Sequence, residues 1–533
     1  MSFAGELFRS LLPYAAAILP INLISSAHYG ATALRAYGRS EDRRAWALYS
    51  VWTTLLLGAG FVGGLHWEMV GSWYITLYLT WSPWHYAGQN FGVAMTFLRR
   101  RGVEVSPRAR MLLQRSFVLS FVLALLALHG QSPLASYAPS QLENGAFGFV
   151  PLGPLLGVSA NISNVLFGTT ALFYVGTTVG GVALIARGRH LRDLVPTLLL
   201  IGTQALWFSV PALARHLSVL AGVDPLSVAH AHYAFLWVGA GHAAQYLWIT
   251  AYFARSQGRS RSHVGFLFKA LLAGCALWVI PSLLFAPSML GRLPYDAGLA
   301  AMVAALVNLH HFTLDGVIWK LREGRIARFL IGQRQPIGEH PSGAVTGQRG
   351  LIGAGLWLGG IACLALATFS AFAPEYRFRR PLERGDLDLA ERGDAALEWI
   401  GQASADRQLQ LGHEALSRNE LVRAERHLRR SVDLLPSAWA WSGIGDVNAR
   451  RERWGAAADA YESALEIDPE HAVATFHLGV IELRRNQPER SRELLLRARK
   501  LAVAAYASHD EDHHPPPGLV EAIDGVLAQF SAR

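Results

Sequence analysis

The sequence predicts an all-α protein in two parts: a polytopic membrane bundle of about ten transmembrane helices, followed by a water-soluble α-solenoid. Three observations support this prediction. Residues 1–372 are mostly apolar, with acids almost absent from the apolar runs, whereas the remaining residues are rich in Arg, Glu, Asp and Ala. Short clusters of Lys and Arg separate the apolar runs. A helical repeat unit of about 34 residues recurs near the C-terminus.

Apolar segments of membrane-spanning length account for the first part. A hydrocarbon core about 30 Å thick requires roughly 20 mostly apolar residues per helix. The segments that meet this requirement are residues 7–34, 45–65, 70–98, 111–129, 160–186, 194–214, 228–253, 264–286, 298–319 and 350–372. The first is interpreted as a retained helix, because it contains no small-residue cleavage site typical of a signal peptide.

The distribution of basic residues predicts the orientation. Alternate loops each hold three to five Lys or Arg residues, and the intervening loops hold none or one. By the positive-inside rule the basic loops are cytoplasmic, so the N-terminus and, after ten spans, the C-terminal part lie outside. In a bacterium, this means an inner-membrane protein with both ends in the periplasm. The net charge of +9 therefore reflects topology signals, and we expect membrane lipids rather than nucleic acid around the chain.

The two cysteines limit the chemistry. Cys275 and Cys363 are the only cysteines, and both lie inside apolar runs. A structural disulfide and a cysteine-based metal site are both disfavoured by this placement.

Small and aromatic residues recur at fixed positions in the C-terminal part. The clearest copies carry Trp441, Gly445, Ala457, Tyr461, Pro469 and Gly479. Residues 405–504 resemble the tetratricopeptide repeat (TPR), a helix–turn–helix unit in which such residues let paired helices pack closely. This resemblance implies a scaffold that binds a protein or peptide partner in a concave groove. The alternative is that the repeats only pack against the outer face of the membrane part.

The domain organisation follows from these patterns. Residues 1–372 are predicted to form the transmembrane domain and residues 373–404 a linker with an entry helix. Residues 405–504 form three repeats, and residues 505–533 a linker with a capping helix.

Histidines occur unusually often within the predicted spans. A charged side chain at the centre of a bilayer costs roughly 2.5–3.5 kcal/mol, so intramembrane ionisable residues usually have a function. Helical rise places His28, His311, His242 and His85 at depths of about 10, 13, 18 and 20 Å from the cytoplasmic ends of their spans. Four separate helices would thus contribute a histidine to one layer. His310 is a weaker candidate, because it points about 100° away from His311.

Other polar residues accompany these histidines. Gln89 and Gln245 lie close to His85 and His242 in the sequence, and Asn308 and Asp315 share a helix face with His311. Gln89, Gln245 and Asn308 could therefore orient imidazole rings from the outer shell of a site. Asp315, the only acid inside a predicted span, could orient a ligand or move protons in catalysis.

Neutral imidazoles with one carboxylate suit Fe, Cu or Zn, and two of the histidines could alternatively be axial ligands of a haem. We therefore predict a metal-dependent membrane oxidoreductase that acts on a lipid or other apolar substrate. Proton- or ion-coupled transport, a TPR-bearing scaffold for envelope enzymes, and histidines that merely join helices by hydrogen bonds remain alternatives.

Known sequence motifs do not decide between these functions. The chain lacks H-E-x-x-H and G-x-S-x-G motifs and a P-loop. In general plan, with single histidines from several helices, the membrane part is similar to the membrane-bound carotenoid dioxygenases. A second polar group near the outer surface is a weaker candidate site and comprises His66, Glu68, His129, His216, His230 and His232.

Overall fold

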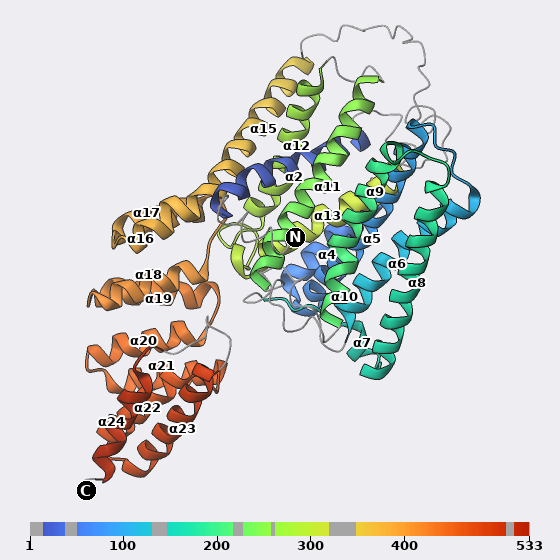
Figure 1. The fold of residues 1–533 in the computed structure, drawn as a ribbon. Coiled ribbons are helices and arrows are strands. Elements are labelled where there is room, and N and C mark those ends of the chain that lie inside the picture. Colours follow the sequence, from blue (N-terminus) through green and yellow to red (C-terminus); the bar gives the residue numbers. More distant parts are fainter. Residues whose placement is uncertain are drawn as a thin grey trace. The chain divides into compact units, whose positions relative to one another are not determined.

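The structure is a computed structural model that describes residues 14–37, 51–130, 146–216, 228–256, 262–318, 348–507 and 516–531. All regular elements within these ranges are helices, which confirms the predicted all-α class (Figure 1). The chain divides into two compact units. Unit 1 comprises Met1–Phe285 and Gly298–Phe372, and unit 2 comprises Ala286–Ala297 and Ala373–Arg533.

Unit 1 is a bundle of long helices. Its elements are α2 (Tyr14–Tyr37), α4 (Thr53–His66), α5 (Glu68–Arg100), α6 (Pro107–His129), α7 (Leu152–Leu155), α8 (Ala160–Ala186), α9 (Leu191–Gln204), η4 (Ala205–Ser209), α10 (Val210–His216), α11 (Val228–Ser256), α12 (His263–Leu284), α13 (Ala300–Ile318) and α15 (Gln348–Ala373). The short helix η6 (Tyr295–Leu299) begins in unit 2 and ends in unit 1. Helices cover the described parts of the ten predicted segments, with ends that differ by a few residues.

Within the described residues, six helical stretches are long and apolar enough to cross a membrane, which indicates an integral membrane protein. They are Pro107–His129, Ala160–Ala186, Leu191–Leu213, His263–Leu284, Tyr295–Gly316 and Gly353–Glu383. The other helices in predicted spans do not meet the requirement of length and hydropathy, for identifiable reasons. Only 14 residues of α4 are described as α-helix, and α2, α5 and α11 carry histidines and other polar groups that reduce their mean hydropathy.

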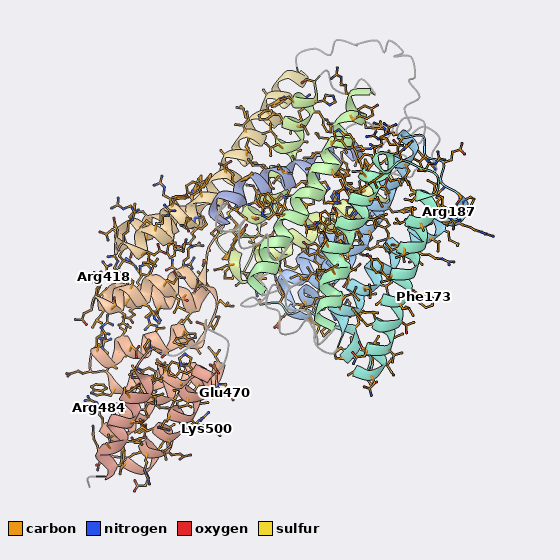
Figure 2. The ribbon with its side chains drawn as sticks, viewed as in Figure 1. Phe173, Arg187, Arg418, Glu470, Arg484 and Lys500 are labelled. Atoms are coloured by element: carbon orange, nitrogen blue, oxygen red, sulfur yellow. The ribbon has the colours of Figure 1, made fainter. Side chains whose placement is uncertain are left out.

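The surfaces of the two units differ in polarity. On α8 and α15 large apolar side chains are exposed, with Leu172 and Leu356 each 73% accessible. Figure 2 shows Phe173 on the outer side of α8. In unit 2 the exposed side chains include Arg418, Arg484 and Lys500. A broad exposed apolar surface is what a helix presents to lipid, whereas charged surfaces require water.

Glycines allow α2 and α12 to pack backbone against backbone. A Cβ atom at Gly30 would lie 1.8 Å from the carbonyl oxygen of Ala270, and one at Gly274 would lie 1.7 Å from that of Ser26. Close approach through small residues is a common means of helix association in membranes. This contact fixes α2, and with it the first histidine of the site, against the bundle.

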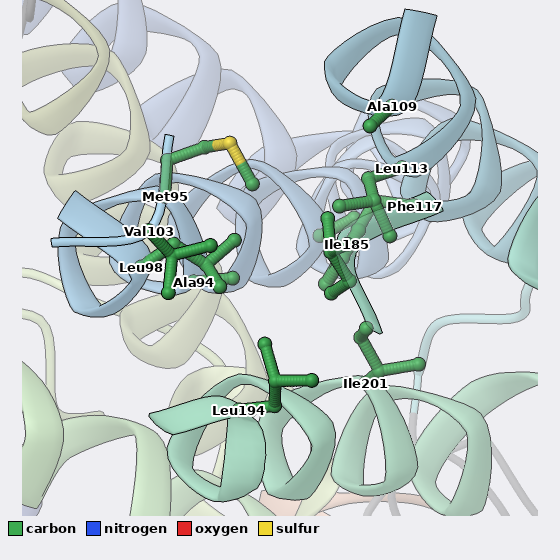
Figure 3. Close-up of a cluster of buried hydrophobic side chains, with 11 residues drawn as sticks. Ala94, Met95, Leu98, Val103, Ala109, Leu113, Phe117, Ile185, Leu194 and Ile201 are labelled. Carbon is green, nitrogen blue, oxygen red and sulfur yellow. The ribbon is translucent and has the colours of Figure 1, made fainter. Parts of the chain in front are cut away.

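Both apolar and polar contacts join α5, α6, α8 and α9. Figure 3 shows the apolar cluster, in which Met95, Phe117 and Ile185 take part. A buried polar chain lies between three of these helices, α5, α9 and α6: the Asn90 amide donates to Gln204 Oε1 over 2.8 Å, and the Gln204 amide donates to Ser120 over 3.1 Å. These bonds satisfy polar groups that would otherwise be costly in an apolar surrounding.

Unit 2 is built from helix pairs. Its elements are η7 (Pro374–Arg379), α16 (Arg380–Glu383), α17 (Leu387–Trp399), α18 (Ala405–Ser417), α19 (Leu421–Leu434), α20 (Ala438–Arg450), α21 (Trp454–Ile467), α22 (Ala472–Arg484), α23 (Pro488–Ala507) and α24 (Leu519–Ser531). A Cβ atom at Gly445 of α20 would lie 2.5 Å from the ring of Tyr461 of α21, so the glycine allows this pair to pack closely.

The segment 286–297 also belongs to unit 2. The Tyr295 amide donates to the Ala403 carbonyl over 2.9 Å, and the Ser404 hydroxyl donates to the Asp296 carboxylate. The loop before α13 is thereby joined to the start of the repeat region.

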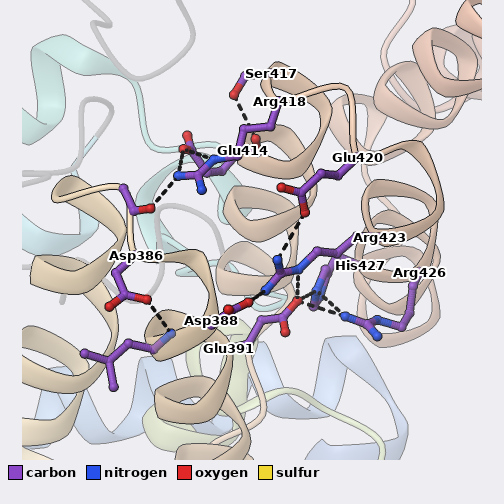
Figure 4. Close-up of polar contacts among 12 residues, drawn as sticks. Asp386, Asp388, Glu391, Glu414, Ser417, Arg418, Glu420, Arg423, Arg426 and His427 are labelled. Atoms are coloured by element: carbon purple, nitrogen blue, oxygen red, sulfur yellow. Dashed lines mark hydrogen bonds and ion pairs between the residues drawn. The ribbon is translucent and has the colours of Figure 1, made fainter.

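A charged network connects α17 with α19 (Figure 4). Arg423 donates to Glu391 and to Asp388, each over 2.6 Å, and Arg426 donates to Glu391 over 2.8 Å. Partial burial alone would raise the pKa of the Glu391 carboxyl, but the hydrogen bonds from Arg423 and His427 outweigh it and lower the pKa to about 2.

Candidate metal centre

Four histidine rings from four helices meet in the interior of unit 1. They are His28 of α2, His85 of α5, His242 of α11 and His311 of α13. Ring centroids are 4.2 Å apart for His28 and His311, 4.8 Å for His85 and His311, 5.0 Å for His28 and His242, and 5.1 Å for His85 and His242. His28, His242 and His311 are no more than 3% exposed, and the side chain of His85 is 7% exposed.

Two overlapping groups of these side chains could hold a metal ion. The first comprises His28, His242 and His311, and the second comprises His85, His311 and Asp315. Within each group the potential ligand atoms lie within 4.8 Å of one another. Because His311 belongs to both groups, the five side chains surround one region of the interior.

The spacing of His85 and His311 suits a shared ion. Their Nε2 atoms are 3.2 Å apart. Two nitrogens bound to one ion at about 2.0–2.1 Å lie about 3.3 Å apart when the angle at the ion is tetrahedral. The same distance also permits a direct hydrogen bond between the two rings, if one Nε2 is protonated.

Two hydroxyl groups form a hydrogen-bonded chain with the second ring nitrogen of His311. The Nδ1 atom of His311 lies 2.9 Å from the Thr32 hydroxyl, which itself lies 2.7 Å from the Tyr246 hydroxyl. When Nδ1 carries the proton and donates it to Thr32, Nε2 presents its lone pair to the centre of the site. Metal-binding histidines commonly have such a partner on the second nitrogen.

His28 and His242 have polar atoms without partners. Among the described residues, no hydrogen-bond partner reaches Nε2 of His28 or either ring nitrogen of His242. An unsatisfied buried polar group costs about 1–3 kcal/mol, so such groups call for an explanation. Histidines that only join helices would use these nitrogens in hydrogen bonds, whereas ligands of an ion would direct them to the ion.

A cavity of about 340 Å³ reaches the site from one side. His85, Tyr246 and Asp315 line the end of the cavity next to the histidine rings, and Asp315 Oδ2 lies 4.0 Å from His85 Nε2. Most of the remaining lining is aromatic or aliphatic. Small-molecule sites are typically concave and apolar, with a few polar groups that fix the ligand.

The other predicted site residues have different surroundings. His310 lies in neither group, because consecutive helix residues point about 100° apart, and its Nε2 is instead 2.9 Å from the Tyr37 hydroxyl. Asn308 accepts a hydrogen bond from Tyr29 over 2.8 Å, so it orients a tyrosine rather than an imidazole.

The two glutamines also make no hydrogen bond to the rings. Gln89 lines the cavity, and neither polar atom of its buried amide has a partner among the described residues. Gln245 is half-buried and has no hydrogen bond to the four rings in the described part of the chain.

The weaker outer group is only partly described. His129 has ordinary structural partners: its Nε2 is 2.8 Å from the Thr80 hydroxyl, and its Nδ1 accepts from the Leu152 amide over 3.1 Å. His216, His230 and His232 lie outside the residues whose side chains the structure describes.

Thr32 and Tyr246 are not among the site residues predicted from the sequence, although a simple signal marks them. Thr32 follows His28 by four residues, and Tyr246 follows His242 by four. Gln89 and Asp315 stand at the same spacing from His85 and His311. Residues four apart share a helix face, so each of the four helices presents a histidine followed by a polar side chain.

Comparison with known proteins identifies the C-terminal region. The tetratricopeptide-repeat family model matches residues 409–472 and 444–508. Residues 409–508 are tetratricopeptide repeats. The TPR match confirms the resemblance seen in the sequence and indicates protein–protein interaction, but it does not extend into the N-terminal region. No curated protein matches the chain.

Proposed function

We propose that unit 1 is a membrane-embedded metal-dependent oxidoreductase that acts on a lipid or other apolar substrate. The observation that carries this proposal is the convergence of four buried histidines and Asp315 beside a mostly apolar cavity. Neutral nitrogen ligands with one carboxylate suit Fe, Cu or Zn.

The surroundings of each side chain suggest its role. His28, His242 and His311 lie away from the cavity and would hold the ion on its closed side. His85 and Asp315 line the cavity and would face the substrate. There Asp315 would balance the charge of the ion and exchange a proton with the substrate. The Gln89 amide, which has no hydrogen-bond partner among the described residues, would bind a polar atom of the ligand.

The spacing of His85 and His311 suits a single ion. Their Nε2 atoms are 3.2 Å apart, close to the separation of two nitrogens on one tetrahedral ion. A haem held by two of the histidines is the alternative. An ion with an open position toward an apolar cavity can activate oxygen or polarise a substrate.

We also propose that the chain crosses the membrane about ten times, with the N-terminus and the TPR region outside. The membership of Ala286–Ala297 in unit 2 supports this topology, because an even number of spans separates that loop from the TPR region. The TPR region then binds a protein or peptide partner on the outer side, where it could bring an envelope protein to the enzyme.

Metal analysis of the full chain, purified in detergent, tests the site. We expect about one Fe or Cu per chain in the wild type, none in His85→Ala/His311→Ala, and no Soret band. His310→Gln is the matched control, because His310 is adjacent in sequence but lies outside both groups. This control should keep its metal.

Each contrary result has a defined meaning. Folded wild-type protein that binds no metal after incubation with Fe²⁺, Cu⁺ or Zn²⁺ would overturn the metal site. Stoichiometric Zn²⁺ under all conditions would retain the site but overturn an oxidoreductase whose metal changes oxidation state, because Zn²⁺ has no redox chemistry. Elution volume and helical content verify that the variants are folded.

A further inference from the structure

The cavity beside the candidate metal centre is lined by a long stretch of α5, from Trp81 to Arg100, with ionisable groups near both ends of that stretch. His85 and Asp315 lie at the inner end, and Arg100 lies at the other end. His85 and Arg100 are separated by 15 positions on α5, which corresponds to about 22 Å along the helix. A ligand that contacts both ends must therefore be long.

The wall between these ends is mostly apolar, and its polar side chains are Gln89, one turn from His85, and Thr96. On one side it is formed by α5, where Gly88 and Gly92 leave room and Phe97 contributes a ring. On the other side it is formed by α11, where Trp248 and Ile249 face the cavity. Such a wall favours a hydrocarbon chain over a polar one.

The end of the cavity at Arg100 is accessible and cationic. Arg100 is exposed, and its guanidinium carbon lies 5.1 Å from the centre of the Tyr252 ring, which is 40% exposed. Arg99 and Arg101 flank Arg100 in the sequence, but only Arg100 lines the cavity. A guanidinium held at the mouth of an apolar cavity favours a ligand with an anionic group at that point.

We infer that this cavity binds a single-chain amphiphile whose anionic head group pairs with Arg100 and whose hydrocarbon chain extends along α5 to the His85–Asp315 end. This assigns a substrate class to the proposed enzyme, and the reaction itself rests on the proposed function. The reacting position then lies in the chain, far from the head group. Binding through Arg100 does not depend on the metal.

Equilibrium binding with matched probes tests the head-group contact. Full-length protein in nanodiscs is titrated with hexadecanoate and with hexadecanol, which has the same chain without the charge. We expect hexadecanoate to bind more tightly, and Arg100→Gln to weaken its binding about fivefold, as expected for one exposed ion pair. Arg100→Lys should keep most of the affinity, and the matched control Arg99→Gln should bind like the wild type.

Photocrosslinking tests where the chain lies. A hexadecanoate with a diazirine at the end of its chain should label residues 81–89 of α5. Gly88→Leu should abolish this labelling, because a Cβ atom at Gly88 meets no atom within 4 Å and the larger side chain would fill the cavity. Gly176→Leu on α8 is the matched control, since a Cβ atom at Gly176 also meets no atom within 4 Å.

The outcomes separate this inference from the proposed function. Equal affinity for both probes, equal effects of Arg99→Gln and Arg100→Gln, or labelling outside this cavity would overturn the amphiphile site. His85→Ala/His311→Ala should still bind hexadecanoate through Arg100. Binding without any metal in the wild type would therefore retain the amphiphile site and overturn only the metal-dependent enzyme.

Discussion

Replacing Thr32 by Val should weaken metal binding without removing any of the proposed ligands. The Thr32 hydroxyl lies 2.9 Å from His311 Nδ1 and is 1% exposed as a residue. Val has nearly the same shape but no hydroxyl. The substitution therefore leaves the Nδ1 atom of His311 without this partner and frees the ring to change its tautomer or rotate.

The expected magnitude follows from the loss of one outer-shell hydrogen bond. Such losses typically reduce metal affinity about 10- to 100-fold, which corresponds to about 1.4–2.8 kcal/mol. Thr32→Ser keeps a hydroxyl at this position and should restore most of the affinity. Tyr246→Phe removes only the second hydroxyl of the pair and should have a smaller effect.

The assay is a competition titration of metal-free protein with Zn²⁺ against a chromophoric chelator of known affinity. Thr250→Val is the matched control, because Thr250 is also buried. Its hydroxyl donates to the backbone of its own helix, over 2.8 Å to the Tyr246 carbonyl and 3.1 Å to the Leu247 carbonyl. Equal affinities for Thr32→Val, Thr250→Val and the wild type would refute the support that we assign to Thr32. Equal losses in both variants would indicate a general packing effect instead.

Three further predictions concern packing and charge. Gly445→Ala should destabilise the TPR region, because the new Cβ would lie 2.5 Å from a ring atom of the paired helix. In contrast, the new Cβ of Gly455→Ala meets no atom within 4 Å, so this variant should be at least as stable as the wild type. Hydrogen exchange across α20 and α21 measures both effects. Gly274→Ala should lower the melting temperature of the full chain in detergent, because the new Cβ would lie 1.7 Å from a backbone oxygen of α2; an unchanged melting temperature would contradict this contact. The pKa of Glu391 is lowered to about 2 in the fold, so ionised Glu391 contributes stability that is fully present above its ordinary pKa near 4.5 and is lost as the pH falls toward 2. Hydrogen exchange in α17 and α19, corrected for intrinsic rates, should therefore rise over that pH range. Glu391→Gln should remove this pH dependence.

Local pattern was sufficient for the helices and the repeats. Long, mostly apolar stretches without charged residues identify helices such as Ala160–Ala186, because a membrane span must satisfy its backbone hydrogen bonds internally. The spacing of Gly445, Ala457 and Tyr461 identifies the TPR region, because the paired helices of each repeat pack closely through small and aromatic residues at the same positions. Both signals depend on residues that are close in sequence, so no knowledge of the tertiary structure was required.

Hydropathy was less decisive for the helices that carry the site. α2, α5 and α11 contain three of the four histidines with their polar neighbours, and none of the three is among the helices apolar enough to count as a span, whereas α13, which carries His311 and Asp315, is. Interior helices can carry such residues because other helices, rather than lipid, surround them. The property that makes them candidates for function therefore also weakens their signal as spans.

The sequence by itself determined which side chains could form the site: single histidines at similar depth on four helices, with Asp315 on the same face as His311. Only the tertiary structure decided that His28, His85, His242 and His311 meet, that His310 pairs with Tyr37 instead, and that a cavity joins the site to Arg100. The physical reason is that depth follows from helical rise along one chain segment, whereas the order and rotation of helices depend on contacts between segments far apart in sequence. The contact of Gly30 and Gly274 with the facing helix is one of these.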